Sequence, residues 1–356
     1  MVQRIIGGKP ADKAKAVRPS GPRAVPTVTP AVMRVKIDEG SEGQRLDNFL
    51  LKLLKGVPKT HVYRVIRSGE VRVNKGRADA DTRLALGDEV RIPPVRVAEK
   101  LDARPAPPRE FAVVFEDEHL IAIDKPAGVA VHGGSGVSFG VIEQLRRARP
   151  GAKFLELVHR LDKETSGLLL IAKKRSALVA LQDQLRARET GKTYAALVIG
   201  EWPESRKVID VALHKFLTAE GERRVAAVPA SSFESAPRQA QGRAQPEAGK
   251  RSITLVRVAR RFAGYTLLDV TIKTGRTHQI RVHLASEGHP IVGDDKYGDF
   301  ALNKRLARGD AVPAVRFDRM FLHARRLRFT HPASGDVLEL EAPLPAECEQ
   351  LLQSLS

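Results

Sequence analysis

The sequence predicts an α+β protein made of a small N-terminal module and a larger second domain. With 356 residues, the chain is long enough for about two domains, each with its own hydrophobic core. Residues 32–94 contain two short helical patterns and a few short strand patterns, which is typical of a compact α+β unit. From residue 110 onward, strand and helix patterns again follow one another, and the first two strands form a hairpin over 111–123.

The net charge is the most informative property of the composition. Lys and Arg number 60 against 42 Asp and Glu, which gives a formal charge of +18. The basic residues are spread along the chain, and such an excess favours a polyanionic partner. Membrane-surface binding is the alternative, but the sequence has no basic amphipathic helix with an exposed aromatic face and no apolar run of bilayer length. We therefore expect a nucleic acid partner and no membrane association.

Cysteine usage and the pattern of acidic residues exclude several other classes. Cys348 is the only cysteine, so the chain has no internal disulfide, as expected for a reducing cytoplasm. A single thiol excludes a thiolate metal site within one chain, and the His-Glu-x-x-His pattern of zinc proteases is absent. A metal-dependent nuclease is disfavoured because the sequence lacks a clustered set of acids. We expect no metal site.

Changes in composition divide the chain into segments. Residues 1–31 combine prolines and basic residues with a single acid, Asp12, and are expected to be a disordered basic arm. Prolines mark a linker after the module, and a stretch rich in Ala, Ser, Gln, Pro and Arg interrupts the second domain. The predicted organisation is an arm at 1–31, a module at 32–94, a linker at 95–109, a second domain at 110–345 with a flexible insertion at 219–251, and a tail at 346–356.

The module is expected to bind RNA phosphates. Its first helix begins near Leu46 and ends near Gly56, its second runs from Pro58 to Gly69, and short strands follow near residues 71–73 and 90–92. Glu70 is the only acid between positions 59 and 77, which favours a phosphate-binding surface over an ordinary solvated face. The cations of this surface are Lys59, Arg64, Arg67, Arg72, Lys75 and Arg77.

The stretch from residue 155 to 173 is the centre of the second domain. Two apolar runs, 155–158 and 168–172, flank a polar corner that contains Asp162 and ends in Thr-Ser-Gly at 165–167. Asp is disfavoured in strands and favoured in turns, so its carboxylate can reach a cleft. The simpler interpretation is that Asp162 only stabilises the turn.

Further elements of the second domain follow from periodicity. A helix is predicted over 177–185 and strands over 191–199, 253–258, 265–272, around 327 and over 337–340. Thr277 is predicted to cap a helix that ends at Gly288. Arg276 and Arg281 lie near the start of that helix, where a positive charge is unfavourable unless an anion is close. That anion is Asp162, a phosphate, or both.

Three segments, taken in order, resemble the RluA-type pseudouridine synthase family. They are Lys-Pro-Ala-Gly at 125–128, His-Arg-Leu-Asp at 159–162 followed by Thr-Ser-Gly at 165–167, and Gly-Arg-Thr-His-Gln-Ile-Arg-Val-His at 275–283. Segments 43–50, 93–99 and 131–136 resemble its RluC-like branch, and the likeness covers about residues 35–345. The two helices of the module, opened by Gln-Arg-Leu-Asp at 44–47 and closed by Gly-Glu-Val-Arg-Val-Asn at 69–74, resemble the S-four-type RNA-binding module.

The resemblance implies both architecture and activity. The second domain is expected to be a catalytic domain with a mixed, largely antiparallel sheet and flanking helices. The reaction converts uridine to pseudouridine in large-subunit ribosomal RNA (the 23S RNA or its precursor), at several sites. It detaches uracil at N1 and rejoins it through C5 without redox change or hydrolysis, so no cofactor is expected. We expect a cytoplasmic protein, in agreement with its single cysteine, that acts as a monomer.

The resemblance assigns roles to individual residues. Asp162 becomes the nucleophile, although whether it attacks the sugar or the base stays open. Arg281 becomes its salt-bridge partner, and Tyr194 packs on the base and is a candidate to take the proton. Arg160 fills the stack that the flipped uridine leaves. The remaining expected substrate-binding residues are His159, Arg276 and Lys125, the last two as phosphate-contacting or cleft-lining side chains.

A non-catalytic RNA-binding factor for ribosome assembly is the alternative interpretation. It accounts for the charge of +18 and for the module. It does not account for the presence of Asp162, Tyr194 and Arg281 together.

Overall fold

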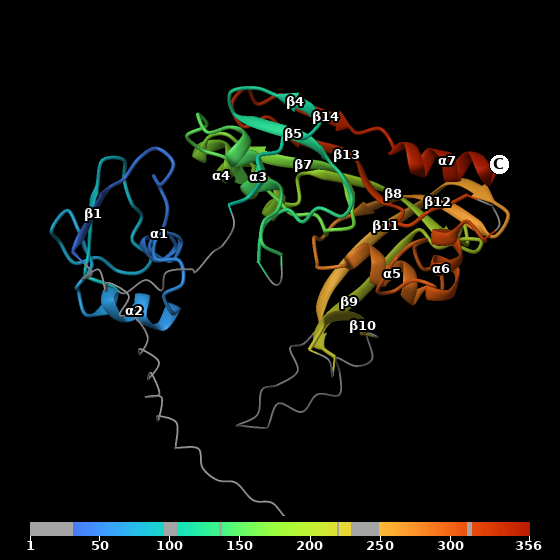
Figure 1. The fold of residues 1–356 in the computed structure, drawn as a ribbon, viewed down its shortest axis with the longest axis horizontal. Coiled ribbons are helices and arrows are strands. Elements are labelled where there is room, and N and C mark those ends of the chain that lie inside the picture. The colour runs from blue at the N-terminus through green and yellow to red at the C-terminus, as the bar shows by residue number, and fades with distance from the viewer. Residues whose placement is uncertain (1–30, 96–104, 135–136, 219–220, 229–248, 312–314) are drawn as a thin grey trace, which may run out of the picture. The chain divides into compact units, whose positions relative to one another are not determined.

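The computed structural model describes residues 31–95, 105–134, 137–218, 221–228, 249–311 and 315–356 (Figure 1). The chain divides into a small N-terminal unit and a larger C-terminal unit, both of which combine helices and strands. This confirms the predicted α+β class. Residues 1–30 of the predicted arm, residues 96–104 of the predicted linker and residues 229–248 of the predicted insertion lie outside the described part.

The N-terminal unit contains two helices and a three-stranded antiparallel sheet. The strand order is β1-β3-β2, so the last strand lies in the middle. The predicted apolar faces are buried: Leu46 and Leu50 of the first helix and Val62 of the second are all inaccessible to solvent. The elements are β1 (Met33–Lys36), α1 (Leu46–Leu53), α2 (Lys59–Arg67), β2 (Arg72–Val73) and β3 (Glu89–Ile92).

The C-terminal unit is built on one eleven-stranded sheet. Nine strands follow the order β10-β9-β11-β12-β8-β13-β7-β5-β4, while β14 pairs with β13 and β6 pairs with β7. Every pairing is antiparallel except that of β13 with β7, so the sheet is mixed and largely antiparallel, as predicted. The strands are β4 (Val113–Glu116), β5 (Leu120–Lys125), β6 (Glu156–Leu157), β7 (Ser166–Ala172), β8 (Gly191–Ile199), β9 (Val208–Leu217), β10 (Arg223–Val228), β11 (Lys250–Phe262), β12 (Tyr265–Ile272), β13 (Leu322–Thr330) and β14 (Val337–Glu341).

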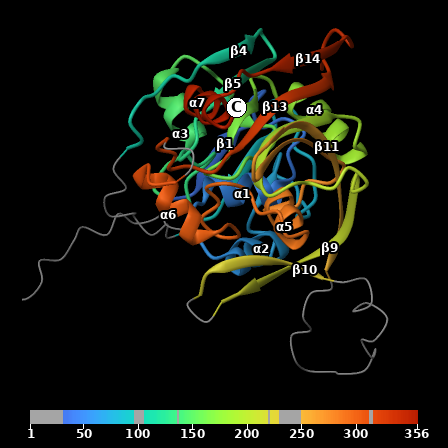
Figure 2. The same ribbon diagram turned by 90° about the vertical axis from the view of Figure 1, so that its right-hand side faces the viewer.

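Helices flank the two halves of this sheet. In Figure 1, α4 lies against β7 and β13, whereas α5 lies against β9, β10 and β11. The view in Figure 2 shows β9 and β10 side by side at one edge of the sheet. The helices are α3 (Val141–Ala148), α4 (Arg175–Ala187), α5 (Gln279–Ser286), α6 (Phe300–Arg308) and α7 (Ala346–Ser354).

Two predicted irregular segments contain regular structure. Residues 346–354, expected to be a tail, form α7, because Cys348, Leu351 and Leu352 lie on one helical face and are buried in the main core. The predicted insertion at 219–251 contributes β10 near its start and the first residues of β11 at its end, both paired with β9. Pairing with β9 stabilises both strands despite the polar composition of the segment, and alternate side chains of β11 are buried from Ser252 onward.

Strands β7, β13 and β8 are paired side by side near the polar corner that contains Asp162. Ala324 of β13 pairs with Gly167 of β7 on one side and with Tyr194 of β8 on the other. Gly167 has φ +106°, and a Cβ placed there would lie 2.4 Å from the carbonyl oxygen of Ala324. Only glycine permits this approach. The corner before β7 and the tyrosine of β8 are therefore fixed relative to each other through β13.

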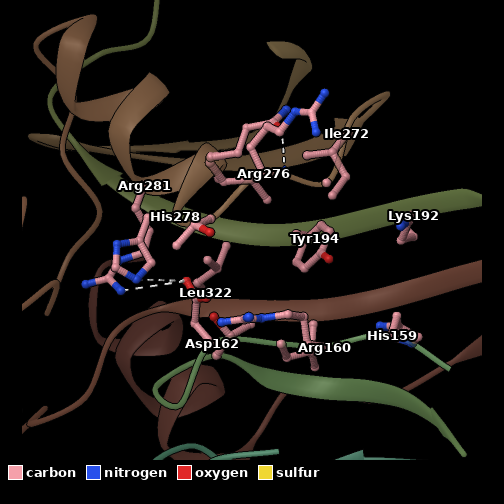
Figure 3. Close-up of a pocket in the computed structure, with 16 residues that line it drawn as sticks. His159, Arg160, Asp162, Lys192, Tyr194, Ile272, Arg276, His278, Arg281 and Leu322 are labelled. Atoms are coloured by element: carbon pink, nitrogen blue, oxygen red, sulfur yellow. Dashed lines mark hydrogen bonds and ion pairs between the residues drawn. The ribbon is translucent and has the colours of Figure 1, made fainter. Parts of the chain in front are cut away.

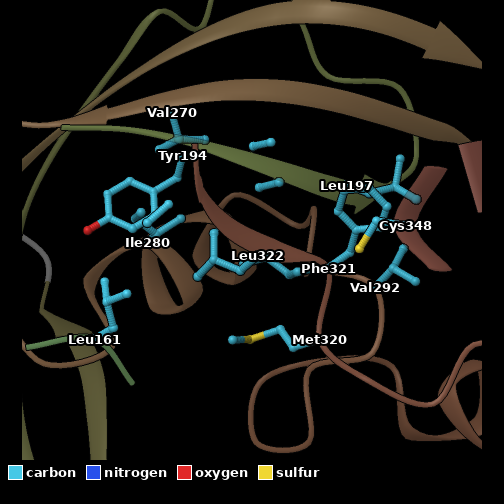
Figure 4. Close-up of a cluster of buried hydrophobic side chains, with 14 of the residues drawn as sticks. Leu161, Tyr194, Leu197, Val270, Ile280, Val292, Met320, Phe321, Leu322 and Cys348 are labelled. Carbon is cyan, nitrogen blue, oxygen red and sulfur yellow. The ribbon is translucent and has the colours of Figure 1, made fainter. Parts of the chain in front are cut away.

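The main core lies beside this line. Figure 4 shows the ring of Tyr194 among Leu161, Ile280 and Leu322, with its hydroxyl oxygen at the margin of the cluster. Ile280 is buried on α5, as its helical spacing predicted. The core thus reaches the polar corner at 162 and holds the surrounding elements in place.

Candidate active site

A pocket of about 220 Å³ opens where the β6–β7 corner, β8, β12 and the start of α5 meet (Figure 3). Its size is below the roughly 300–1,000 Å³ of pockets that hold drug-sized ligands, which suits one flat ring. Of the site residues predicted in the second domain, only Lys125 is absent from its lining. The lining residues are His159, Arg160, Leu161, Asp162, Thr165, Lys192, Tyr194, Ile272, Gly275, Arg276, Thr277, His278, Gln279, Ile280, Arg281 and Leu322.

Asp162 projects into the pocket from a tight corner between β6 and β7. The backbone N–H of Thr165 donates to the carbonyl oxygen of Asp162 at 3.2 Å, so the turn is closed by the backbone and the carboxylate is left for other contacts. The Asp162 side chain is 21% exposed. Its Oδ2 lies 3.7 Å from Nη1 of Arg281 and 4.0 Å from Nε2 of His278, as the dashed lines in Figure 3 indicate. Asp162 therefore does more than stabilise its turn.

Arg281 is held mainly by a carboxylate that the sequence did not single out. Its guanidinium is 3% exposed and donates from Nε and Nη2 to Asp294 at 2.7 and 2.6 Å, and from Nη2 to Asp295 at 2.9 Å. The predicted pair with Asp162 is present but longer. Burial would lower the pKa of Arg281, but the Asp294 hydrogen bonds and the neighbouring carboxylates raise it, so the residue stays a cation.

Asp294 is itself fixed by its loop. Its carboxylate is fully buried and also accepts the backbone N–H groups of Lys296 and Tyr297. Burial raises the pKa of Asp294, but the contacts with Arg281 outweigh that effect and leave the pKa below its usual value. The Arg281–Asp294 pair is a rigid, ionised unit that faces Asp162.

His278 occupies the turn that leads into α5. It has φ +52°, one of four non-glycine residues with positive φ in the described part of the chain. Its Nδ1 lies 2.8 Å from the hydroxyl of Tyr297, and burial lowers the pKa of its imidazole although Asp162 opposes this. The predicted cap by Thr277 is wrong, because His278 occupies the cap position and the side chain of Gln279 accepts the N–H of Arg276 instead.

Tyr194 borders the pocket from β8. It is almost fully buried, and Lys192, two residues earlier on the strand, reaches the same pocket because alternate side chains share one face. Burial and the charge of Asp162 raise the pKa of the Tyr194 phenol, so it is neutral at ordinary pH. A neutral phenol donates a hydrogen bond readily but is a poor proton acceptor.

His159 and Arg160 differ in their surroundings although they are adjacent. The His159 Nε2 accepts the backbone N–H of Leu170 in β7 at 3.1 Å, and burial, helped by Lys192, lowers its pKa to about 3. The neutral imidazole of His159 thus links the corner to β7 through a hydrogen bond, and it also lines the pocket. Arg160 is exposed at the pocket margin, where its guanidinium is available to a ligand.

Two further hollows adjoin the pocket and share Gly275 and Arg276 with it. Arg276 is exposed, in agreement with its predicted position at the edge of the cleft. Neither lining contains a carboxylate among the described residues. The basic residues of the first hollow, besides Arg276, are Arg186, Arg188, Lys192 and Lys273, and those of the second are His214, Lys215 and Lys250.

Lys125 does not contact this pocket, contrary to the prediction. Its ammonium is 0% exposed and donates to the carbonyl oxygens of Pro126, Val129 and Lys163 at 2.8, 2.9 and 3.1 Å. Burial lowers its pKa to about 7. Lys125 therefore joins two loops from inside the protein, and one of them is the loop that carries Asp162.

The cations predicted in the N-terminal unit lie on α2, in β2 and in the segment that follows β2. Five of them are exposed, and Arg72 is half-buried. Arg77 donates to the carbonyl of Ser68 and Arg67 to that of Tyr63. In the described residues, none of the six forms an ion pair with a carboxylate. The exposed cations are Lys59, Arg64, Arg67, Lys75 and Arg77.

The described residues contain no group of three or more His, Cys, Asp or Glu side chains placed to hold a metal ion. Each helix in the described part of the chain is too short or too polar to cross a bilayer.

Comparisons with known proteins identify two families. The sequence model of the RNA pseudouridylate synthase family matches residues 119–286, and that of the S4 domain matches residues 44–90. The chain is 47% identical over 335 residues to ribosomal large subunit pseudouridine synthase C of Escherichia coli (strain K12), covering 92% of this chain and 98% of that protein. It is 47% identical over 334 residues to the protein of the same name from Haemophilus influenzae, with coverage of 92% and 96%.

Solved structures agree with the sequence comparisons. Human RNA pseudouridylate synthase domain containing 4 superposes with a TM-score of 0.52 at 25% identity, over 68% of this chain and 92% of that one. Human RNA pseudouridylate synthase domain containing 1 gives 0.50 at 28% identity, over 69% and 94%.

Proposed function

The chain belongs to the RluA-type pseudouridine synthases, in the RluC-like branch, and we propose that it converts specific uridines to pseudouridine in large-subunit ribosomal RNA. Synthases of this family are isomerases, so a purely non-catalytic assembly factor is no longer a competing interpretation. The proposal includes action at more than one uridine. It also includes a monomer that acts in the cytoplasm.

The chemistry requires one bond to break and another to form at the same sugar carbon. The bond from C1′ to N1 of uracil is cleaved, the ring turns, and C1′ bonds to C5. The proton on C5 is lost and N1 gains one, so no electrons or atoms enter from a co-substrate. A carboxylate nucleophile divides this rearrangement into easier steps by holding the intermediate covalently. We assign that role to Asp162.

The observation that carries the assignment is the placement of Asp162 opposite Arg281. Its carboxylate enters a pocket suited to one ring, and a buried guanidinium lies 3.7 Å from Oδ2. Arg281 places a positive charge beside this carboxylate, and a carboxylate acts as a nucleophile in its ionised form. Arg281 also stabilises the charge that returns to the carboxylate when the intermediate breaks down.

Tyr194 and Arg160 are proposed to handle the flipped base. Tyr194 presents its ring edge and neutral hydroxyl to the pocket, so it supports the uracil by packing and by a donated hydrogen bond. Its raised pKa makes a role as proton acceptor unfavourable at neutral pH. The exposed guanidinium of Arg160 is planar and suited to occupy the stack from which the uridine has left.

RNA phosphates are proposed to contact cations on both sides of the pocket. The two hollows that share Arg276 with it are lined by Arg188 and Lys273 in one and by Lys215 and Lys250 in the other. Together with the S4 domain, these cations provide the sequence-independent part of RNA affinity. His159 is proposed to orient Arg160 rather than to contact RNA through a charge.

The deciding experiment measures release of tritium from C5-labelled uridine in ribosomal RNA. Wild type, Asp162→Asn and Glu164→Gln are compared on naked RNA and on assembled large subunits. Asp162→Asn is expected to reduce the rate by about 10⁴-fold or more, because an amide cannot act as the nucleophile. Glu164→Gln changes a carboxylate two residues away that does not line the pocket and is expected to be active. Full activity of Asp162→Asn contradicts the assignment, and an inactive wild type on both substrates contradicts the proposed function.

A further inference from the structure

His278 lines the pocket and has no role in the proposal so far. Its backbone is left-handed at φ +52°, a conformation that is unfavourable for a non-glycine residue. Such strain persists only where the surrounding structure imposes it. Here it turns the imidazole into the pocket, with Nε2 4.0 Å from Oδ2 of Asp162 (Figure 3).

The hydroxyl of Tyr297 can fix where the imidazole proton of His278 lies. The hydroxyl oxygen of Tyr297 accepts the backbone N–H of Val225 at 3.1 Å and lies 2.8 Å from Nδ1 of His278. The hydroxyl keeps a proton of its own, and Nδ1 of His278 is within range to accept it. A neutral imidazole that accepts at Nδ1 carries its proton on Nε2, the nitrogen that faces Asp162.

Burial favours the neutral imidazole and lowers its pKa, whereas the charges that face it act in both directions. Arg281 and Lys296 are the cations that face it, and Asp162 and Asp294 are the facing carboxylates. The Tyr297 ring lies edge-on to His278 at 5.5 Å and also carries the guanidinium of Arg281 at 5.2 Å. The ring of Tyr297 therefore contacts both His278 and Arg281 and helps to position both side chains.

We propose that His278 is a positioning residue for the reaction, whose Nε2–H, directed by Tyr297, holds the nucleophilic carboxylate of Asp162 together with Arg281. This inference rests on the proposed role of Asp162. Both donors face the same oxygen, Oδ2, which leaves Oδ1 as the oxygen that attacks. The present separations of 3.7 and 4.0 Å shorten when the substrate closes the pocket, as catalytic hydrogen bonds commonly do on substrate binding.

The first test compares two substitutions at one position. His278→Leu removes the N–H at similar volume, and His278→Gln restores an amide N–H near the position of Nε2. At saturating RNA, His278→Leu is expected to lower the single-turnover rate by about 10–100-fold with the RNA Kd within about twofold of wild type. His278→Gln is expected to lie within about fivefold of wild type. Equal loss in both variants, at melting temperatures like that of wild type, overturns the proposal.

A second test reads the tautomer directly and does not depend on activity. Nitrogen-15 spectra of protein labelled at histidine are expected to show His278 unprotonated at Nδ1 and protonated at Nε2, with the signals assigned by their loss in His278→Gln. Tyr297→Phe is expected to shift these signals toward a mixture of tautomers. A wild-type proton on Nδ1 overturns the proposal, even if the position 278 variants fail to fold.

The control is His119→Leu, which changes a histidine that does not line the pocket and should leave the rate unchanged. An active wild type with an unaffected His278→Leu variant overturns this inference alone. A wild type that forms no pseudouridine overturns the proposed function and this inference with it.

Discussion

Asp294 holds the guanidinium of Arg281 through two hydrogen bonds of 2.7 and 2.6 Å, although it lies outside the pocket lining. Arg281 is thus oriented before any substrate binds. Since its closest bonds are to Asp294, the carboxylate of Asp162 keeps a cation beside it without being neutralised by a short ion pair.

Replacing Asp294 is expected to affect both stability and rate. Asp294→Asn leaves a buried guanidinium without its main counter-charge, which typically costs about 3–5 kcal/mol. The freed Arg281 would also turn toward Asp162 and reduce its nucleophilicity, so the rate should fall by about 100-fold or more. Urea unfolding and single-turnover assays measure the two effects. Asp295→Asn, at a side chain that is 62% exposed, is the control and should change stability by about 0.5 kcal/mol or less. Wild-type stability of Asp294→Asn would contradict this account.

Lys125 is expected to contribute to stability rather than to RNA binding. Lys125→Met leaves buried carbonyl groups without a donor, at about 1–3 kcal/mol for each group that stays unsatisfied. Denaturation by urea should show a clear loss of stability, while the RNA Kd of the folded variant stays near that of wild type. Lys163→Met, on an exposed side chain, is the comparison. A large change in Kd without a change in stability would restore the role predicted from sequence.

The same lysine should make stability depend on pH. The pKa of Lys125 is about 7 in the folded protein against 10.5 ordinarily. Below pH 7 both the folded and unfolded chains hold the proton, so the residue adds no pH dependence. Between about pH 7 and 10.5 the unfolded chain binds more protons, and the free energy of unfolding rises with pH. The difference between wild type and Lys125→Met, measured by urea titration across this range, should grow with pH. A constant difference would show an unshifted lysine.

Arg160 is expected to matter most where the target uridine is stacked and paired. Arg160→Ala should slow modification of structured RNA, because nothing fills the vacated stack. The defect should diminish on an RNA in which the target uridine is mismatched, since that base already flips at lower cost. Arg160→Lys keeps the charge without the planar group and separates stacking from electrostatics. The same loss on paired and mismatched RNA would indicate a role other than stack filling.

The exposed cations of the N-terminal unit should contribute to the salt dependence of RNA binding. Glutamine at Lys59, Arg64, Arg67, Lys75 and Arg77 together is expected to weaken binding. The slope of log K against log salt should become shallower by about 0.7–0.9 for each RNA phosphate that the variant no longer neutralises. Filter binding across a salt series measures this, with Lys36→Gln and Lys55→Gln as exposed controls in the same unit. An unchanged slope would remove this surface from the RNA interface.

The sequence predicted those parts of the site that depend on local pattern. Two apolar strands around a polar corner located Asp162, and helical spacing placed Ile280 in the core beside Arg281. The sequence did not indicate the Arg281–Asp294 pair, because that contact depends on how the loop after α5 folds back. The Gly-Asp-Asp turn at 293–295 was the available signal: acids that follow a glycine next to a short apolar run.

Burial was the other property that sequence reasoning missed. Lys125 follows an apolar strand and precedes a proline turn, a context that equally suits an exposed phosphate ligand and a buried donor to carbonyl groups. The signal for α7 was present, since Cys348, Leu351 and Leu352 have helical spacing after Pro345. His278 takes a conformation that helix capping rules assign to other residues, so its role emerged only from the backbone geometry.

The close contact of Gly167 with Ala324 depends on the absence of a Cβ atom at position 167. A methyl group at position 167 would force β7 and β13 apart, since its carbon would come within 2.4 Å of the carbonyl oxygen of Ala324. The displacement would pass along the chain to Asp162 while Tyr194 stayed with β13. A damaging variant of this enzyme can therefore leave every lining residue of the pocket unchanged, and an inventory of those residues alone would classify it as intact.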